Sequence, residues 1–226
     1  MGLGARVRAL ADVRSAGSAS SRMRDARFEL FRELLDGLPR PVRVLDVGGT
    51  NGFWARRGLG GAGDEIDITI ANAVPQPQHF ENIRSVVVDA TDMRVWDDGA
   101  FDVVFSNSTI EHLFTWEAQV AMAAEVRRLA PAYSVQTPSF WFPLEPHYLV
   151  PGWQWLPRSL RVEILTRRRV GHRGPLPRAA ARESVAEIRL LTTPQMRRLF
   201  PDADIVPERV GPLLKSVTAV RRRPGR

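Results

Sequence analysis

Two short segments each place a carboxylate close to an imidazole. In PLEPHYLVP, a proline separates Glu145 from His147, and Tyr148 follows directly. In IEHLF, Glu111 precedes His112. A carboxylate beside an imidazole orients the ring and raises its basicity, so such a histidine can act as a general base. Because two prolines stiffen the first segment, we expect His147 to be the general base, with Glu145 orienting it or binding the acceptor. His112 is the second catalytic candidate.

A glycine-rich turn follows a short apolar segment near the start of the chain. The segment VRVLDVGGTNGFW (42–54) places Asp46 just before Gly48, Gly49 and Gly52. Glycines after a strand let a ligand approach the backbone closely. Neither a Gly-Lys-Ser/Thr loop nor a G-x-G-x-x-G fingerprint is present, and Asp46 would repel a phosphate but favour an ammonium group. S-adenosylmethionine, which has an ammonium and a sulfonium but no phosphate, fits these requirements.

The elements that position these residues alternate between strands and helices. This order implies parallel βαβ units, whose carboxyl ends form one ligand-binding edge of a sheet. We expect strands directly after Pro41 and at 66–71, 85–90, 101–107, 132–138, 202–210 and 215–222. We expect helices at 21–38, from about Phe53, from Trp116 to Leu129 and at 193–200, where Thr193 is the expected cap.

The composition is that of a globular protein. The 226 residues are 44% hydrophobic and 25% charged, which is typical of one domain with a buried core. The sequence contains no cysteine, which excludes disulfides, zinc–cysteine sites and cysteine nucleophiles and favours a reducing compartment. We find no signal peptide and no apolar segment long enough to span a membrane, so we expect a cytoplasmic protein.

The charge balance is strongly basic. The net charge is +7, and Lys215 is the only lysine, so nearly all the positive charge comes from arginine. Such a balance favours nucleic acid, anionic lipid or acidic substrates as partners. A solvated basic surface explains the same numbers. We favour the solvated surface over a dedicated site for a polyanion such as nucleic acid.

Four segments, in order, resemble motifs of the class I S-adenosylmethionine-dependent methyltransferases. VLDVGGTNGFW resembles the first motif, and VVVDATDM (86–93) resembles the third-strand motif, whose acid and following residue hold the adenine edge. FDVVFSNSTIEHL (101–113) is similar to the fourth-strand motif of the bacterial group called methyltransferase type 11. EVRRLAPAYSVQTPS (125–139) resembles the helix and fifth strand that follow. The resemblance covers residues 40–140 well and 190–222 in outline.

This resemblance implies the fold. We expect an α/β protein, a Rossmann-like αβα sandwich with a seven-stranded, mostly parallel sheet. The last strand is expected to be antiparallel, and an insertion or substrate lid is expected after strand five. The aromatic and proline-rich segment FWFPLEPHYLVPGWQWLP, which starts at Phe140, is the beginning of that insertion.

The resemblance also implies the cofactor contacts. Together with Gly49 of the turn, the expected S-adenosylmethionine contacts are Asp46, Gly48, Gly49, Gly52, Asn72, Asp89, Ala90 and Asn107. The family usually has an acid at the end of strand two that binds both ribose hydroxyls, where this chain has Asn72. Asparagine offers only one acceptor oxygen. We therefore expect either a lower cofactor affinity or assistance from Gln76 or Gln78, since Asp67 lies inside the strand.

The acceptor is expected to be a sugar. Members of the type 11 group often act on small metabolites, lipids and saccharides. Trp141 and Tyr148 are aromatic residues suited to the face of a sugar, and the pair Glu111–His112 often shapes the pocket in this group. A hydroxyl acceptor loses a proton during methyl transfer, so a base such as His147 is needed. We therefore expect O-methylation of a sugar hydroxyl in a saccharide or polysaccharide precursor.

Three alternatives remain open at this stage. A nucleic-acid methyltransferase, acting for example on RNA, would explain the basic tail RRRPGR, although SNSTIEH is not the Asn/Asp-Pro-Pro-Tyr motif of enzymes that methylate base amino groups. A cofactor-binding module without catalysis would explain Asn72. A nicotinamide-dependent oxidoreductase shares the fold but would need the missing fingerprint and ribose acid.

The expected organisation is one methyltransferase domain with additions. We assign residues 1–39 to an N-terminal arm and helix, 40–222 to the methyltransferase domain and 223–226 to a basic tail. Within the domain, residues 140–190 are the acceptor-side insertion. The apolar N-terminal helix is expected to cover the cofactor or to pair with a second subunit in a homodimer.

The sequence predicts no metal site. The clustered carboxylates that an all-protein metal cage needs are absent from it. A magnesium ion bridging the protein and the acceptor would have only Glu145, His147 and Asp102 as candidate ligands, and the sequence offers no further support for one.

Overall fold

The computed structural model describes residues 19–61, 65–171 and 173–223. The predicted arm before residue 19 and the tail residues 224–226 lie outside the described residues. The α-helices are α2 (Ala19–Asp36), α3 (Asn51–Arg56), α4 (Trp116–Leu129), α5 (Arg158–Arg167), α6 (Arg178–Ala186) and α7 (Thr193–Leu199). The strands are β1 (Val42–Val47), β2 (Ile66–Asn72), β3 (Ile83–Val87), β4 (Val103–Asn107), β5 (Ala132–Pro138), β6 (Leu144–Glu145), β7 (Val150–Pro151), β8 (Asp204–Val210) and β9 (Leu213–Arg221). Two 3-10 helices are η2 (Ile110–His112) and η3 (Trp153–Trp155).

The chain divides into two compact units. The sheet unit comprises the described parts of Leu34–Trp141 and Ile188–Arg226. The insertion unit comprises the described part of Met1–Glu33 together with Phe142–Glu187. We describe each unit by itself.

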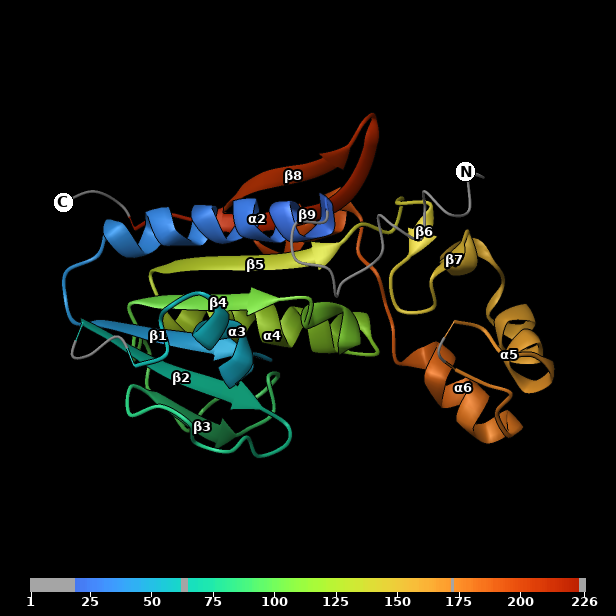
Figure 1. The fold of residues 1–226 in the computed structure, drawn as a ribbon, viewed down its shortest axis with the longest axis horizontal. Coiled ribbons are helices and arrows are strands. Elements are labelled where there is room, and N and C mark those ends of the chain that lie inside the picture. Colours follow the sequence, from blue (N-terminus) through green and yellow to red (C-terminus); the bar gives the residue numbers. More distant parts are fainter. Residues whose placement is uncertain (1–18, 62–64, 172, 224–226) are drawn as a thin grey trace. The chain divides into compact units, whose positions relative to one another are not determined.

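The sheet unit is built on one seven-stranded sheet in the order β3-β2-β1-β4-β5-β9-β8 (Figure 1). Strands β1 to β5 run parallel to one another, whereas β9 is antiparallel to both β5 and β8. The predicted Rossmann-like sheet with an antiparallel last strand is therefore confirmed. Strand order reverses between β1 and β4, and ligands bind beyond the carboxyl ends of the strands at such a point.

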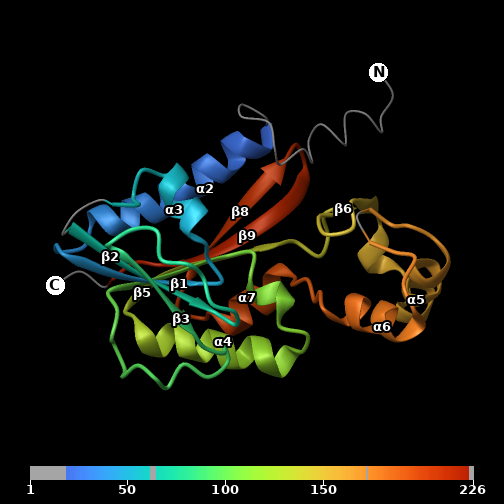
Figure 2. The same cartoon turned by 60° about the horizontal axis from the view of Figure 1, so that its bottom comes forward.

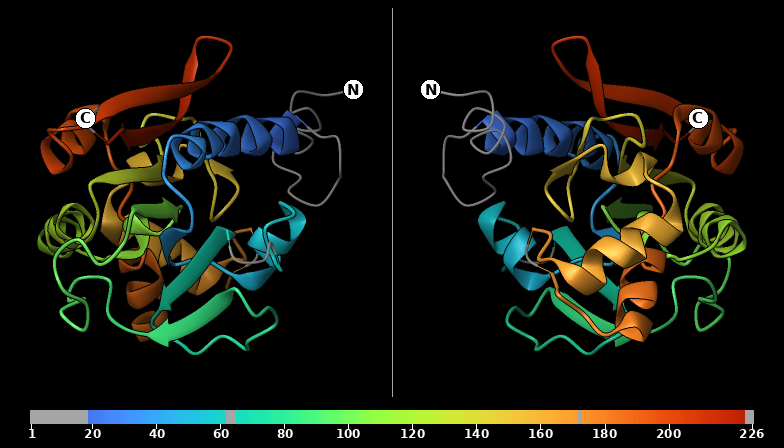
Figure 3. Two further views of the ribbon diagram at one scale, coloured as in Figure 1. Left: turned by 90° about the vertical axis from the view of Figure 1, so that its left-hand side faces the viewer. Right: turned by 90° about the vertical axis from the view of Figure 1, so that its right-hand side faces the viewer.

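Helices cover both faces of this sheet. Figure 2 shows α4 and α7 on one face and α3 on the other. Figure 3, which looks along the strands, shows the β8–β9 hairpin in red at one edge and β3 in green at the other. Threonines begin these helices, because their hydroxyls accept hydrogen bonds from exposed amides. Thr50 caps α3 and Thr115 caps α4 in this way.

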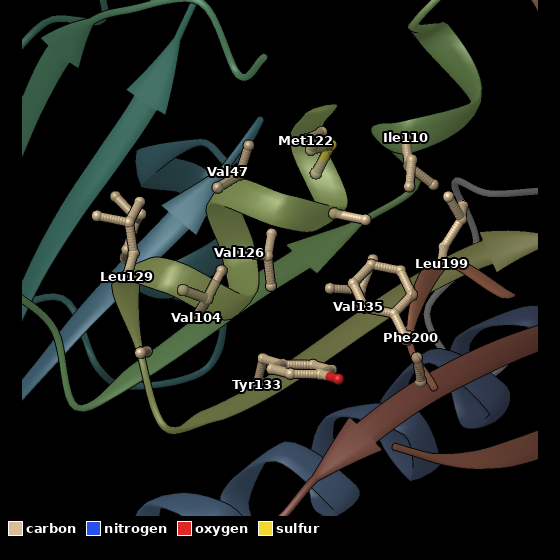
Figure 4. Packing of buried hydrophobic residues seen from close by; sticks show 14 of the residues in the cluster. Val47, Val104, Ile110, Met122, Val126, Leu129, Tyr133, Val135, Leu199 and Phe200 are labelled. Carbon is tan, nitrogen blue, oxygen red and sulfur yellow. The ribbon is translucent and has the colours of Figure 1, made fainter. Parts of the chain in front are cut away.

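The core of the sheet unit lies between the sheet and the face formed by α4 and α7. Figure 4 shows side chains from β1, β4, β5, η2, α4 and α7 packing together, among them Val47, Val104, Ile110, Met122, Val126, Leu129, Tyr133, Val135, Leu199 and Phe200. All of these side chains are buried. Since each contributes roughly 1.5–3 kcal/mol by leaving water, this cluster fixes the strand ends that form the site.

Among the element boundaries that differ from the predictions, two have a clear local cause. The third strand, expected at 85–90, is β3 at Ile83–Val87, because Asp89 turns the chain by accepting hydrogen bonds from the backbone and hydroxyl of Thr91. The last helix is capped by Thr192 and not by Thr193, because Thr192 and Gln195 form a reciprocal capping box.

The insertion unit has its own small core. Strands β6 and β7 form a two-stranded antiparallel sheet, and α5 and α6 lie side by side (Figure 3). The rings of Tyr148 and Trp153 are both buried, with their centroids 4.8 Å apart. In the described part of the chain, none of the helices combines the length and apolar character that crossing a membrane requires.

Candidate functional site

The glycine turn after β1 requires glycine at two positions. Gly48 has a φ of +82° and donates its amide to the backbone oxygen of Ala71 at 2.8 Å. A Cβ atom on Gly48 would lie 2.2 Å from Oγ1 of Thr109, and one on Gly49 would lie 1.6 Å from Oδ2 of Asp46. The turn therefore leaves the backbone bare and lets Asp46 pack directly beneath it.

Asp46 is a buried carboxyl group, only 1% exposed. Its Oδ2 accepts a hydrogen bond from Nε1 of Trp54 at 2.7 Å, while Oδ1 has no hydrogen-bond partner within the described residues. Burial raises the pKa of Asp46 to about 7, although the bond from Trp54 lowers it. The neutral and charged forms of the Asp46 carboxyl group are therefore close in free energy near neutral pH, and a nearby cation would favour the charged form.

Asn72, at the end of β2, holds this turn from the neighbouring strand. Its Nδ2 donates to the backbone oxygen of Gly49 at 2.7 Å. An aspartate at this position has no N–H group and could not form the bond. Among the described residues, neither Gln76 nor Gln78 joins Asn72 in the lining of the adjacent cavity.

A cavity of about 480 Å³ lies beside the turn. Four of the expected cofactor residues line it, namely Gly48, Asn72, Asp89 and Ala90, and so does His112. The prediction had missed the other lining residues, which are Val47, Ala71, Ala73, Val88, Thr91, Thr109, Leu113, Phe114 and Ala118. Most come directly before or after a predicted site residue, so position past a strand was the available signal.

The remaining expected cofactor residues do not line the cavity. Asp46 is buried beneath the turn, and Gly49 is a partly buried residue of the turn itself. Gly52 lies in α3, where an added Cβ would meet only the flexible end of Arg56 at 3.3 Å, so glycine is not required there. Asn107 is partly buried and ends β4.

Glu111 and His112 of η2 differ in exposure, although a carboxylate oxygen of Glu111 and a ring nitrogen of His112 lie within 4.8 Å of each other. His112 lines the cavity, whereas Glu111 is completely buried and outside its lining. Oε2 of Glu111 accepts a hydrogen bond from the hydroxyl of Thr137 at 3.0 Å. The backbone oxygen of Glu111 accepts from the amide of Arg189 at 2.7 Å. Glu111 therefore supports η2 through Thr137 and Arg189, and its contact with the acceptor stays a prediction.

In the insertion unit, Glu145 and His147 form a preformed pair. Oε1 of Glu145 lies 2.6 Å from Nδ1 of His147. Oε2 accepts from the backbone amides of His147 at 2.8 Å and Tyr148 at 2.6 Å. Glu145 is buried. Because a carboxylate oxygen can only accept, Nδ1 of His147 is assigned as the donor of this bond.

The two aromatic residues expected to bind the acceptor differ sharply in exposure. Tyr148 is 2% exposed, and its hydroxyl bonds to the backbone oxygen of Ser184 at 2.7 Å and lies 2.9 Å from Oγ of that residue. Burial raises the pKa of Tyr148. Tyr148 is thus a core residue of the insertion unit, which corrects the expectation that its ring faces the acceptor. Trp141, in the sheet unit, is 60% exposed.

Asp102 is not placed to bind a metal ion. It precedes β4, at the end of the strand opposite Asn107. Both of its oxygens accept hydrogen bonds from Arg43, from Nη2 to Oδ1 and from Nε and the backbone amide to Oδ2. Desolvation raises the pKa of Asp102, but the hydrogen bonds from Arg43 outweigh it and lower the pKa overall. This carboxylate is therefore committed to an ion pair.

Comparisons with known proteins agree with this architecture. Residues 45–132 match the model of a family described as a methyltransferase domain. None of the curated proteins matches the chain in sequence.

Two solved structures share the fold over most of the chain. The 1,6-didemethyltoxoflavin-N1-methyltransferase of Burkholderia thailandensis, solved with 1,6-didemethyltoxoflavin and S-adenosylhomocysteine bound, is 19% identical, and the match covers 96% of this chain and 86% of that one with a TM-score of 0.50. An S-adenosylmethionine-dependent methyltransferase of Methanosarcina mazei is 14% identical, and the match covers 85% of this chain and 97% of that one with a TM-score of 0.51. At these identities the likeness establishes the fold.

Proposed function

We propose that the chain is a class I S-adenosylmethionine-dependent methyltransferase, which the match of residues 45–132 to a methyltransferase-domain family supports, and that it methylates a hydroxyl oxygen of a saccharide or saccharide precursor. The main support for a hydroxyl acceptor is the 2.6 Å contact between Oε1 of Glu145 and Nδ1 of His147. A hydroxyl must lose its proton as its oxygen is methylated, so it needs a general base. Amine and thiol acceptors depend less on a general base.

The sheet unit has the features that S-adenosylmethionine requires. Its cavity of about 480 Å³ falls within the usual range for small-molecule sites. Bound there, S-adenosylmethionine would supply a methyl group on a positively charged sulfur. The buried oxygen of Asp46 without a hydrogen-bond partner favours a ligand that carries positive charge. We assign the ribose to the side-chain oxygen of Asn72 and the adenine edge to Asp89 and Ala90, with the bare backbone of Gly48 beside them.

The insertion unit supplies the acid–base chemistry in this proposal. Glu145 holds the ring of His147 in one orientation and leaves Nε2 able to accept a proton. Nε2 takes the proton of the acceptor hydroxyl as the oxygen forms its bond to carbon, and the charge that develops on the ring is balanced by Glu145. Since Glu145 also accepts two backbone amides, it is a positioning residue that acts through His147.

Exposed aromatic rings support a saccharide as the acceptor. Trp141 is 60% exposed and Trp155 is 48% exposed, although large apolar side chains are usually buried. Flat aromatic surfaces that remain in contact with water suit the C–H faces of sugar rings. We keep these two tryptophans as the acceptor-binding candidates in place of Tyr148.

The test is a methyl-transfer assay with S-adenosylmethionine labelled in its methyl group and a panel of mono- and disaccharides. We expect label in an alkali-stable ether, and we expect His147→Ala to lower turnover by about 10²–10⁴-fold. S-adenosylhomocysteine should bind the variant as it binds the wild type. Near-normal turnover in His147→Ala with the cofactor bound would refute the general base, and His112→Ala is the matched comparison.

Two further predictions, a cytoplasmic location and a homodimer, also belong to this proposal. A cytoplasmic site of action rests on the absence of cysteine. The homodimer has less support, because the apolar residues of the N-terminal helix, Phe28, Phe31, Leu34 and Leu35, are already buried within the chain.

A further inference from the structure

Arg161, on α5 of the insertion unit, is a partly buried cation without a partner. Its Nε atom is shielded from solvent and has no hydrogen-bond partner, and its guanidinium group forms no ion pair with any described residue. Holding a charge partly out of water without a counter-charge is unfavourable. Such an arrangement in a folded protein calls for an explanation.

Other arginines of the insertion unit form ion pairs. Arg167 and Arg178 both pair with Glu163, and Arg173 pairs with Glu187. Residues 142–187 contain eight arginines and only four carboxylates, Glu145, Glu163, Glu183 and Glu187. Glu163 and Glu187 are engaged by arginines, Glu145 is engaged by His147 and Tyr148, and Glu183 is exposed. None of the described carboxylates of residues 142–187 therefore forms an ion pair with Arg161.

Arg161 lies within electrostatic range of the proposed base. Burial, the largest influence, lowers the pKa of Arg161, and Arg158 lowers it further, whereas Tyr148 and Glu145 raise it. A guanidinium group keeps its charge even so. The Glu145–His147 pair and an unpaired cation thus belong to the same part of the insertion unit.

We infer that Arg161 binds an anionic group of the acceptor, so that the saccharide methylated by this enzyme is acidic. This inference rests on the proposed function and narrows its substrate class. A carboxylate or phosphate would accept two parallel hydrogen bonds from the guanidinium fork, which is the geometry that arginine provides. The same ionic contact would restrain the acceptor while His147 takes its proton.

The experiment is calorimetric titration of the full-length protein saturated with S-adenosylhomocysteine. The probes are glucuronate, which carries a carboxylate, glucose 6-phosphate, which carries a phosphate, and glucose, which carries no anionic group. The variants are Arg161→Gln, which removes the charge, and Arg161→Lys, which keeps the charge but loses the fork. Arg169→Gln is the matched control, because Arg169 is an exposed arginine of the same unit. Melting temperatures show whether each variant folds.

We expect at least one acidic sugar to bind more tightly than glucose. Arg161→Gln should weaken that binding by about tenfold or more, Arg161→Lys should weaken it less, and Arg169→Gln should change it by less than about twofold. The inference is wrong if glucose binds as well as both acidic sugars, if no sugar binds, or if Arg161→Gln binds them as the wild type does.

The labelled-methyl assay separates this inference from the proposed function. Methylation of neutral saccharides that depends on His147 but not on Arg161 would leave the function standing and remove the anion site. Binding of acidic sugars through Arg161 without methylation of any saccharide would support the anion site and refute the proposed function.

Discussion

The side-chain amide of Asn72 donates a hydrogen bond to the backbone oxygen of Gly49, with 2.7 Å between the two atoms. This bond ties the end of β2 to the turn that follows β1. The residue that departs from the acid usual in the resembling family thus has a structural role of its own. Its side-chain oxygen is left as the single acceptor for a ribose hydroxyl.

Asn72→Asp should weaken cofactor binding even though it restores the usual acid. The substitution removes the donor to Gly49 and places a carboxylate beside a carbonyl oxygen, which should cost about 1–3 kcal/mol. Titration with S-adenosylhomocysteine measures the effect. Gln78→Glu adds the same charge at an exposed residue outside the cavity lining and is the control. Tighter binding by Asn72→Asp would show that the ribose contact outweighs the bond to the turn.

Gly49→Ala and Gly52→Ala should differ widely in stability. The first places a Cβ 1.6 Å from the carboxylate of Asp46, whereas the second meets only a flexible arginine tip at 3.3 Å. We expect Gly49→Ala to lower the free energy of unfolding by about 3 kcal/mol or more. Gly52→Ala should change it by less than about 1 kcal/mol, since alanine favours the helix. Urea denaturation measures both, and equal losses would contradict the packing of Asp46 beneath Gly49.

The cofactor-free protein should lose stability as the pH rises from about 4 through 7 because of Asp46. Its pKa is about 7 in the folded chain and 3.8 in the ordinary state, so the folded form holds a proton that the unfolded form has released. Stability falls with pH wherever the folded state binds more protons. The total effect is on the order of a few kcal/mol.

Asp46→Asn removes this proton and is the matched variant, since its side-chain oxygen can still accept from Trp54. Urea denaturation between pH 4 and 8 should show a steeper decline for the wild type than for Asp46→Asn. Parallel curves for the two proteins would mean that Asp46 is already ionised in the folded state.

Tyr148→Phe should lower stability without changing acceptor affinity. The variant loses the hydrogen bonds between the Tyr148 hydroxyl and Ser184 inside the insertion unit. We expect a loss of about 1–2 kcal/mol, because the buried oxygen of Ser184 is left without its donor. Trp141→Ala, at an exposed ring, should raise KM with little effect on stability. A raised KM for Tyr148→Phe would contradict this and indicate that Tyr148 contacts the acceptor.

The sequence by itself determined the order of the elements of the sheet unit and the place of the cofactor turn. Alternating strands and helices and the glycines after Asp46 depend on residues close together in the chain. Local hydrogen bonding and backbone freedom are short-range properties, so their pattern can be recognised without a structure. The end of β3 was predicted too late because Asp89 turns the chain two residues beyond Val87.

Only the tertiary structure decided which side chains of the candidate site are buried, paired or exposed. Tyr148 and Glu111 lie inside, Asn72 holds a turn on another strand, and Arg161 is left without a partner. Each of these facts depends on contacts between segments distant in sequence. Desolvation and pairing are set by the whole surroundings of a group, which spacing along the chain does not specify.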